Sequence, residues 1–175
     1  MACVKRVNEN GGKKLHKQGL LLLILLLPFS VLAQDLSKHN WYFGNSANGI
    51  RFNRGTNVAQ PVTNQATPFG QGGAAVATDP ATANLLFYTD GIRVYDATHT
   101  IMPNGTGLNA LANTNQPVAI CPMPGQTNRW YIFTNTASFT TGGSISRSAV
   151  DMNQPGNAVF PAPFLGVVEA AKNVA

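Results

Sequence analysis

The sequence predicts an all-β protein, and three observations support this class. Apolar and aromatic runs are short and are separated by clusters of Gly, Asn, Pro, Thr and Asp. Residues 85–96 read as a β-hairpin, and part of this hairpin recurs further along the chain. No long segment has the 3.6-residue period of an amphipathic helix, so only the tail, residues 167–175, is expected to start a helix.

The hairpin at residues 85–96 (LLFYTDGIRVYD) joins two strand-like runs through Asp90-Gly91. This dipeptide is typical of the two-residue type I′ turn, in which both positions take positive φ. Such a turn puts Phe87 opposite Val94. One face then carries Leu85, Phe87, Ile92 and Val94, and the other carries Leu86, Tyr88, Arg93 and Tyr95. Both faces are largely apolar or aromatic, so we expect the hairpin to pack against neighbours on both sides.

A repeat suggests how such hairpins are arranged. Residues 85–90 (LLFYTD) match residues 130–135 (WYIFTN) at an offset of 45, and the preceding strands, GGAAVATD and PVAICPMP, correspond at about 44. That period is the span of a four-stranded propeller blade. We therefore predict a partial β-propeller-like array of about three blades of antiparallel strands, preceded by a signal peptide; closed propellers typically have 4 to 8 blades. A generic β-sandwich is the alternative fold.

The N-terminal 33 residues read as a secretory signal peptide. A basic leader precedes the run LLLLILLL, Pro28 ends that run, and Val31 and Ala33 occupy the positions that a signal peptidase inspects. We expect cleavage between Ala33 and Gln34, which leaves residues 34–175 as an incomplete β-propeller-like domain. The alternative, an uncleaved anchor, is disfavoured because the apolar run is shorter than the roughly 20 residues that span a bilayer. A lipid anchor is not expected either, since Cys3 lies far upstream of the cleavage point.

The net charge of +5 at first suggests a nucleic-acid partner. Much of it belongs to the leader, where the basic residues are Lys5, Arg6, Lys13, Lys14 and Lys17. From Gln34 onward the chain is nearly neutral, so no electrostatic footprint for a polyanion remains. We expect no nucleic-acid partner, and contact with a membrane only during export.

Cleavage would leave Cys121 as the only cysteine, so an intramolecular disulfide is excluded in the exported domain. Cys121 lies in PVAICPMPG, between apolar residues and two prolines. A nucleophilic role is possible in principle, but these neighbours favour a small buried hydrophobe.

No catalytic, cofactor or metal constellation emerges from the motifs. Residues 105–110 (GTGLNA) fit a dinucleotide-binding pattern but lack its βαβ context, and residues 44–49 (GNSANG) miss the nucleophile-elbow spacing by one residue. His39 and His99, read as surface or turn histidines, form no metal-ligand spacing with Cys121. The acidic residues Asp79, Asp90, Asp96 and Asp151 read as turn or strand-end aspartates. We therefore expect no cofactor and no enzymatic activity in this segment.

Four aromatic residues leave a binding role open. They are Trp41, Tyr42, Trp130 and Tyr131. Their rings could stack on sugar rings, but their positions within strand runs favour core packing.

Four segments resemble a known family of proteins. They are residues 40–53 (NWYFGNSANGIRFN), 84–108 (NLLFYTDGIRVYDATHTIMPNGTGL), 129–134 (RWYIFT) and 148–152 (SAVDM). In this order they resemble the N-terminal propeller-like region of large Bacteroidetes surface proteins, which end in a gliding motility-associated C-terminal domain read by type IX secretion. The resemblance covers nearly all of residues 34–172 and implies export and a surface location, but it supplies no catalytic residues. The turn PATAN departs from the family's usual Gly-Asn turn, and the family's sorting domain is not among these residues, so we expect them to be a fragment of a larger protein.

Three hypotheses for function follow. The first is an exported cell-surface or extracellular module with a non-catalytic adhesion or interaction role. It would be a fragment of a larger protein and would bind an unknown carbohydrate or protein ligand. The second is the scaffold of a secreted polysaccharide or glycoconjugate hydrolase whose catalytic groups lie elsewhere. The third is a signal-bearing fragment with no independent function.

Overall fold

The computed structural model describes residues 36–44, 46–63, 73–111, 114, 116–137, 142–161 and 163–175. These residues form strands β1 to β11 and no helix, which confirms the predicted all-β class. The predicted signal peptide, residues 1–33, lies outside the described residues. No helix in the described part of the chain is long and apolar enough to cross a membrane.

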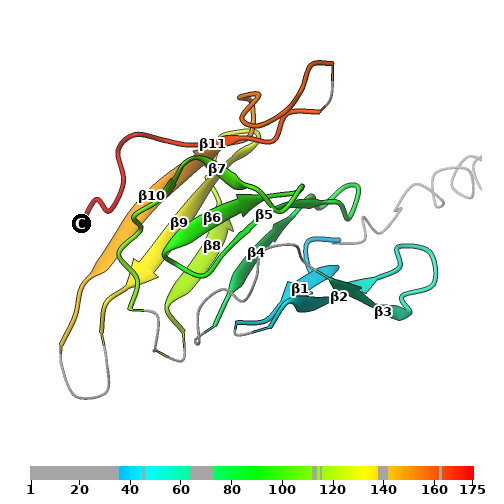
Figure 1. Cartoon of the computed structure of the whole chain (residues 1–175), viewed down its shortest axis with the longest axis horizontal. Helices are drawn as coiled ribbons and strands as arrows, with labels where there is room; N and C mark the ends of the chain where they lie inside the picture. The colour runs from blue at the N-terminus through cyan, green and yellow to red at the C-terminus, as the bar shows by residue number, and fades with distance from the viewer. Residues whose placement is uncertain are drawn as a thin grey trace, which may run out of the picture. The chain divides into compact units, whose positions relative to one another are not determined.

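The strands form three antiparallel sheets, none of which is closed (Figure 1). Sheet A contains β1 (Asn40–Tyr42), β2 (Asn48–Phe52) and β3 (Ala59–Thr63). Sheet B contains β4 (Ala75–Thr78), β5 (Leu85–Thr89), β6 (Arg93–Asp96) and β7 (Ile101–Thr106). Sheet C contains β8 (Val118–Pro122), β9 (Arg129–Asn135), β10 (Ile145–Asp151) and β11 (Val167–Val168). Within each sheet the strands follow one another in sequence order, as short connections between antiparallel neighbours require.

Sheet B is buried on both faces, because sheets A and C pack against its opposite sides. The core between sheets B and C includes Phe87, Val94, Trp130, Ile132 and Val150. The core between sheets A and B includes Tyr42, Tyr88 and Tyr95. Phe87 and Tyr88 are both fully buried, although they are neighbours in the chain. The prediction that both faces of this hairpin need packing partners is therefore confirmed.

The turn of the hairpin differs from the prediction. Thr89 pairs with Val94 and Phe87 pairs with Asp96, so four residues rather than two lie between the last paired positions of the hairpin. The Asp90 carboxylate explains the longer loop, because its Oδ1 accepts the backbone N–H groups of Ile92 and Arg93 at 2.8 Å each. The register of the hairpin is therefore shifted by two residues from the predicted one. Because side chains alternate with a period of two, Phe87 and Val94 still share one face, and Tyr88 and Tyr95 still share the other.

A bulge exchanges the faces predicted for two leucines. Ala77 pairs with Phe87 while Thr78 pairs with Leu85, so Leu86 is an extra residue in β5. Leu85 therefore packs with the core between sheets A and B, and Leu86 packs with the core between sheets B and C. The prediction for these two side chains was wrong, because a bulge cannot be read from alternation alone.

The same bulge refines the internal repeat. The two matching segments form β5 and β9, each of which is the second strand of a four-stranded sheet. Leu85 and Trp130 correspond at the predicted offset of 45, since each faces the preceding sheet. After the extra residue the faces match at 44, so that Tyr88 corresponds to Ile132.

The C-terminal tail is extended rather than helical. Val167 and Val168 form β11, which pairs with the end of β10, and Val174 makes a further bridge to Arg147. The expected helix over residues 167–175 is wrong because the free edge of β10 offers these residues backbone partners that local propensity does not reveal.

Candidate functional site

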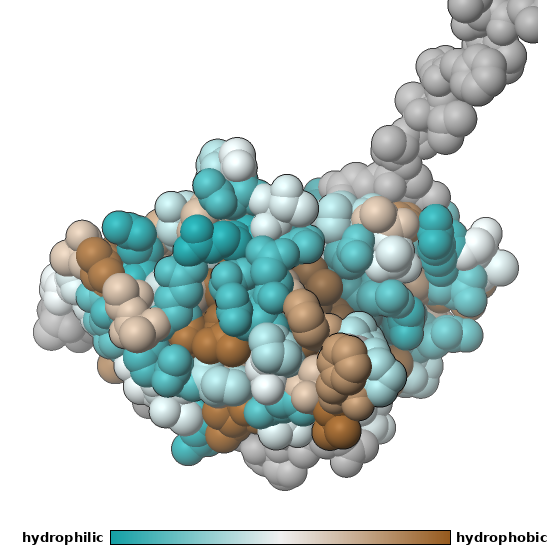
Figure 2. Space-filling model, turned by 90° about the horizontal axis from the view of Figure 1, so that it is seen from above, coloured by the Kyte–Doolittle hydropathy of each residue, from teal (hydrophilic) through white to brown (hydrophobic). Residues whose placement is uncertain are grey.

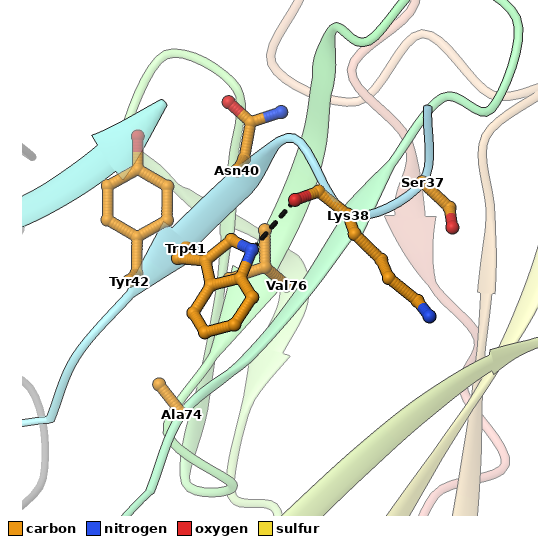
Figure 3. A pocket seen from close by; sticks show the side chains of 7 residues that line it. All are labelled: Ser37, Lys38, Asn40, Trp41, Tyr42, Ala74 and Val76. Atoms are coloured by element: carbon orange, nitrogen blue, oxygen red, sulfur yellow. Dashed lines mark hydrogen bonds between the residues drawn. The ribbon is translucent and has the colours of Figure 1, made fainter. Parts of the chain in front are cut away.

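An open groove along the free edge of β1 is the strongest candidate for a binding site in the described part of the chain. It encloses about 230 Å³ and is open to solvent. Its lining residues are Ser37, Lys38, Asn40, Trp41, Tyr42, Ala74 and Val76 (Figure 3). They come from β1, from the turn before it, and from the facing strand β4 with the residue before that strand. The groove thus lies where sheet A meets the face of sheet B.

The backbone of β1 offers hydrogen-bonding groups to this groove. The backbone N–H of Phe52 donates to the carbonyl of His39 at 2.8 Å, so odd-numbered positions of this stretch bond to β2. In an antiparallel pair the alternate positions point their N–H and C=O groups the other way. The backbone groups of Asn40 and Tyr42 therefore face the groove, and no described residue forms a hydrogen bond with them.

The side chains of Asn40 and Tyr42 hold this edge in place. The Asn40 amide donates to the hydroxyl of Thr78 at 3.2 Å and to the carbonyl of Ala83 at 3.0 Å. The ring of Tyr42 stacks on Tyr88, with ring centroids 4.7 Å apart. Both side chains are buried against sheet B, so the open edge is fixed to the core rather than fraying at the surface.

Trp41 is the exposed aromatic residue of the groove. Its side chain points to the opposite side of β1 from Asn40 and Tyr42 (Figure 3) and is 50% exposed. The indole N–H donates to the carbonyl of Lys38 at 2.7 Å, and the ring meets Phe52 edge to face at 6.4 Å. These contacts fix the ring in one orientation while leaving half of its surface available to a ligand. The ammonium group of Lys38 adds a positive charge to the lining.

The four candidate aromatic residues divide evenly between core and surface. Tyr42 and Trp130 are buried, as core packing predicted. Trp41 is half exposed, and Tyr131 is partly exposed on the outer face of sheet C, where the Arg147 guanidinium lies 5.7 Å from its ring centroid. The division follows from strand alternation, because adjacent residues of a strand point to opposite faces.

The histidines and the cysteine differ in part from their predicted environments. His39 is buried rather than exposed: its Nδ1 lies 3.1 Å from the carbonyl of Leu36, and its Nε2 is buried without a hydrogen-bond partner. His99 occupies a turn with φ of 67° and its Nδ1 lies 3.1 Å from the Tyr88 hydroxyl. Burial lowers the pKa of His99, against the opposing charge of Asp96. Cys121 is only half buried, because its position in β8 turns it to the outer face of sheet C.

The aspartates have structural partners, as the sequence predicted. Oδ1 of Asp79 accepts the backbone N–H of Ala81 at 2.8 Å. The fully buried Asp96 accepts hydrogen bonds from the backbone N–H groups of Thr98 and Thr100 and from the side chains of Thr98 and Asn157. These carboxylates therefore close turns at the ends of strands. Among the described residues, no three His, Cys, Asp or Glu side chains are grouped so that they could hold a metal ion.

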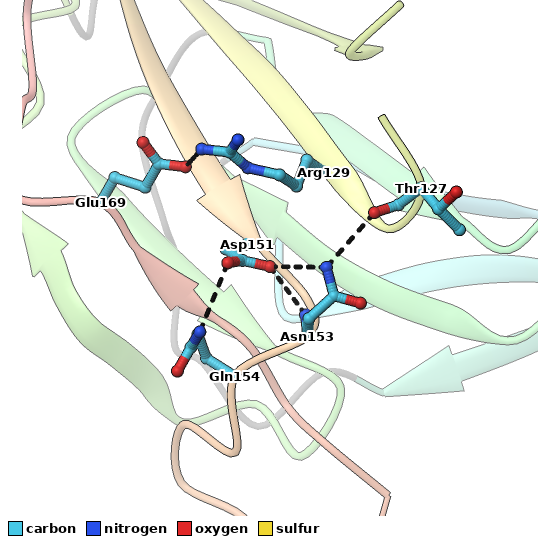
Figure 4. Close-up of polar contacts among 6 residues, drawn as sticks. All are labelled: Thr127, Arg129, Asp151, Asn153, Gln154 and Glu169. Atoms are coloured by element: carbon cyan, nitrogen blue, oxygen red, sulfur yellow. Dashed lines mark hydrogen bonds and ion pairs between the residues drawn. The ribbon is translucent and has the colours of Figure 1, made fainter. Parts of the chain in front are cut away.

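A second polar cluster lies at one end of sheet C (Figure 4). Oδ1 of Asp151 accepts both the backbone N–H and the side-chain amide of Asn153, each at 2.9 Å. Burial raises the pKa of Asp151, but the hydrogen bonds from Asn153 and Gln154 and the charge of Arg129 outweigh it and lower that pKa. Arg129 forms an ion pair with Glu169, which joins β9 to the segment after β11. These contacts tie the C-terminal segment to the sheet.

A larger open hollow of about 440 Å³ is less suited to recognition. Its lining residues are Arg51, Asp79, Asn84, Leu85, Leu86, Ala97, Met152, Pro163, Phe164 and Leu165. The Asp79 carboxylate in its wall is already occupied by turn hydrogen bonds. Figure 2 shows one face of the molecule, where apolar side chains form separate small groups among hydrophilic ones rather than one large patch. The groove beside Trp41 therefore combines the features of a binding site better than these surfaces.

No protein-family model, curated protein or solved structure matches this chain. The geometry of the groove is therefore the basis for inferring function.

Proposed function

We propose that this chain is an exported cell-surface or extracellular module that binds a ligand without catalysis, on a partial β-propeller-like scaffold. The observation that carries the binding role is Trp41, a fixed and half-exposed aromatic ring in an open groove. The exposed half of the indole makes no packing contact with the described residues, and sugar rings and protein side chains both bind to such a surface.

The packing of sheet B supports the propeller-like arrangement over the β-sandwich. A sandwich has two layers, so each sheet buries one face. Here sheet B buries Phe87 on one face and Tyr88 on the other. In addition, the first strand β4 lies against the first strand β8, and the last strand β7 lies against the last strand β11. Stacking of like strand on like strand is the relationship between successive blades of a propeller.

Export and surface location rest on the leader and on the family resemblance. Analysis of the N-terminus of material secreted by cells that express the chain tests them. We expect the sequence to begin at Gln34, in agreement with cleavage after Ala33. Recovery of material that begins at Met1, or that retains residues 20–33, would contradict export by this route.

The binding role is tested by measuring the affinity of the mature protein for immobilised extracellular polysaccharides and matrix proteins. Trp41→Ala is expected to weaken binding at least about tenfold, which corresponds to the loss of one well-packed aromatic contact. Phe160→Ala, which removes an even more exposed aromatic ring, is the matched control and should bind like wild type. Equal binding by wild type and Trp41→Ala would refute a role for the groove. Release of reducing sugar from a polysaccharide would instead support the hydrolase-scaffold alternative.

A further inference from the structure

We propose that the open edge of β1 binds an extended polypeptide strand, which joins sheet A as its fourth strand. The partner of the groove is thus a polypeptide, and this proposal rests on the proposed function only in that both take the groove as a binding site. It requires neither a surface location nor an adhesive role.

The comparison of β1 with β9 defines the position of the incoming strand. Each strand carries a Trp-Tyr pair, Trp41-Tyr42 in β1 and Trp130-Tyr131 in β9. Trp130 packs into the core shared with the preceding sheet, and Tyr131 lies on the other side of β9. In β1, Tyr42 packs into the core shared with the following sheet, B, so Trp41 lies on the side that would face a preceding sheet. The strand β1 is thus equivalent to β9, the second strand of its sheet, and no described strand occupies the first position in sheet A.

The hydrogen-bonding alternation of the two strands agrees with this equivalence. In sheet C, Met123 donates to the carbonyl of Arg129, and Asn135 donates to the carbonyl of Pro117. Odd-numbered residues of β9 therefore bond to the first strand, β8, and Tyr131 is one of them. Tyr42, the counterpart of Tyr131, likewise turns its backbone groups away from β2 and into the groove. The edge of β1 thus presents the backbone pattern that β9 uses to bind a strand.

The groove lies beside β1 on a face of β4, where a first strand of sheet A would lie. In sheets B and C the first strands, β4 and β8, lie against each other. On its opposite face β4, together with the residue before it, presents Val76 and Ala74 to the groove beside β1. The strand β1 itself also contacts β4, so a strand in the groove would lie beside β1 along the same face of β4. Strand addition of this kind uses main-chain hydrogen bonds for affinity and alternate side chains for specificity.

The strand β8 indicates which side chains the partner carries. Its residues Ala119 and Cys121 share the face of Tyr131, so their counterparts in the groove would lie against Ala74 and Val76. Small side chains fit that contact. Val118 and Ile120 alternate with them, and their counterparts would lie on the side of Trp41. The inferred partner is therefore an extended segment that alternates small residues with larger apolar ones.

A peptide that copies residues 116–123, with the change C121S to prevent oxidation, is the probe. Fluorescence anisotropy of the labelled peptide with the mature protein should show saturable binding. Two N-methylated versions then test the strand geometry, because N-methylation removes a backbone donor. Methyl groups at positions 121 and 123, whose N–H groups would bond to Tyr42 and Asn40, should weaken binding at least about tenfold. Methyl groups at positions 118 and 120, on the other edge of the peptide, should have little effect.

Variants of the protein provide the second arm. Ala74→Arg should fill the groove and abolish peptide binding, whereas Ala158→Arg, outside the groove, should not; thermal unfolding of each variant shows whether it is folded. Absence of peptide binding, or equal effects of the two N-methylation patterns, would overturn strand addition. Displacement of Trp41-dependent binding by a soluble oligosaccharide, without peptide binding, would overturn it while leaving the proposed function intact. Peptide binding by a protein that is not exported would refute only the proposed function.

Discussion

Phe87 and Tyr88 are adjacent in the chain and are both fully buried, but they belong to two different cores. Phe87 meets Trp130 of sheet C edge to face, with ring centroids 6.2 Å apart. Tyr88 lies between Tyr42 and Tyr95, stacked on both rings at 4.7 and 5.2 Å. One strand thus links the packing of all three sheets, because its side chains alternate between the two interfaces.

Truncation of either residue should therefore be costly. We expect Phe87→Ala and Tyr88→Ala each to lower the free energy of unfolding by about 3 to 5 kcal/mol, the usual range for a large side chain removed from a core. Phe160→Ala, at an exposed position, should change it by less than about 0.5 kcal/mol. Chemical denaturation measures all three. A small effect of either core variant would show that its interface between sheets does not form.

The turn at Gly91 provides a second test. Gly91 has a φ of 85°, and a Cβ atom there would lie 2.4 Å from the Cβ of Ala110. Gly91→Val should therefore be destabilised by left-handed strain of about 1 to 2 kcal/mol and by overpacking of about 1 to 3 kcal/mol. Gly125→Val is the control, since Gly125 has a φ of 71° with open space around it. If the two variants melt at the same temperature, the contact with Ala110 does not constrain this loop.

The buried carboxylate of Asp96 should matter more than the other turn aspartates. Asp96→Ala leaves four donors without their acceptor, two of them from Thr98, and should cost about 3 kcal/mol. Asp79→Ala removes two contacts at a more exposed turn and should cost about 1 kcal/mol. Denaturation of the two variants measures the difference. If Asp96→Ala lost binding to the immobilised polysaccharides or matrix proteins but kept the free energy of unfolding of wild type, its structural role would be contradicted.

The pH dependence of stability should reflect His99. Burial lowers the pKa of His99 in the folded protein from its ordinary value of 6.5, so the unfolded chain binds this proton more tightly. Neutral His99 therefore makes its full contribution to the free energy of unfolding above about pH 6.5, and this contribution is lost as the pH falls below that value. His99→Asn keeps a residue that tolerates the positive φ but cannot titrate. Thermal melting between pH 5 and 7.5 should show a weaker pH dependence in this variant, and an unchanged one would contradict the assignment.

Much of the fold could be predicted from the sequence because its signals are local. Alternation of apolar and aromatic residues identified the strands, and Asp90-Gly91 identified the hairpin. The aspartates were recognisable as turn residues, since a short carboxylate bonds the backbone only two or three residues onward. The exposure of Trp41 could not be predicted from its position in a strand run. Alternation predicts that Trp41 and Tyr42 face opposite sides of the strand, but it does not predict which side another sheet covers.

The sequence by itself determined the all-β class, the hairpin and the approximate period of the repeat, because backbone propensity and turn chemistry act over a few residues. Only the tertiary structure decided which faces are buried and which strand edge is open. The bulge at Leu86 depends on the pairing of β5 with β4, and the extended tail at Val174 depends on the free edge of β10. The groove beside Trp41 likewise depends on the contact between β1 and β4, because its lining residues come from β1, the turn before it, and β4 with the residue before that strand. These features arise from contacts between residues distant in the chain, which local sequence patterns do not encode.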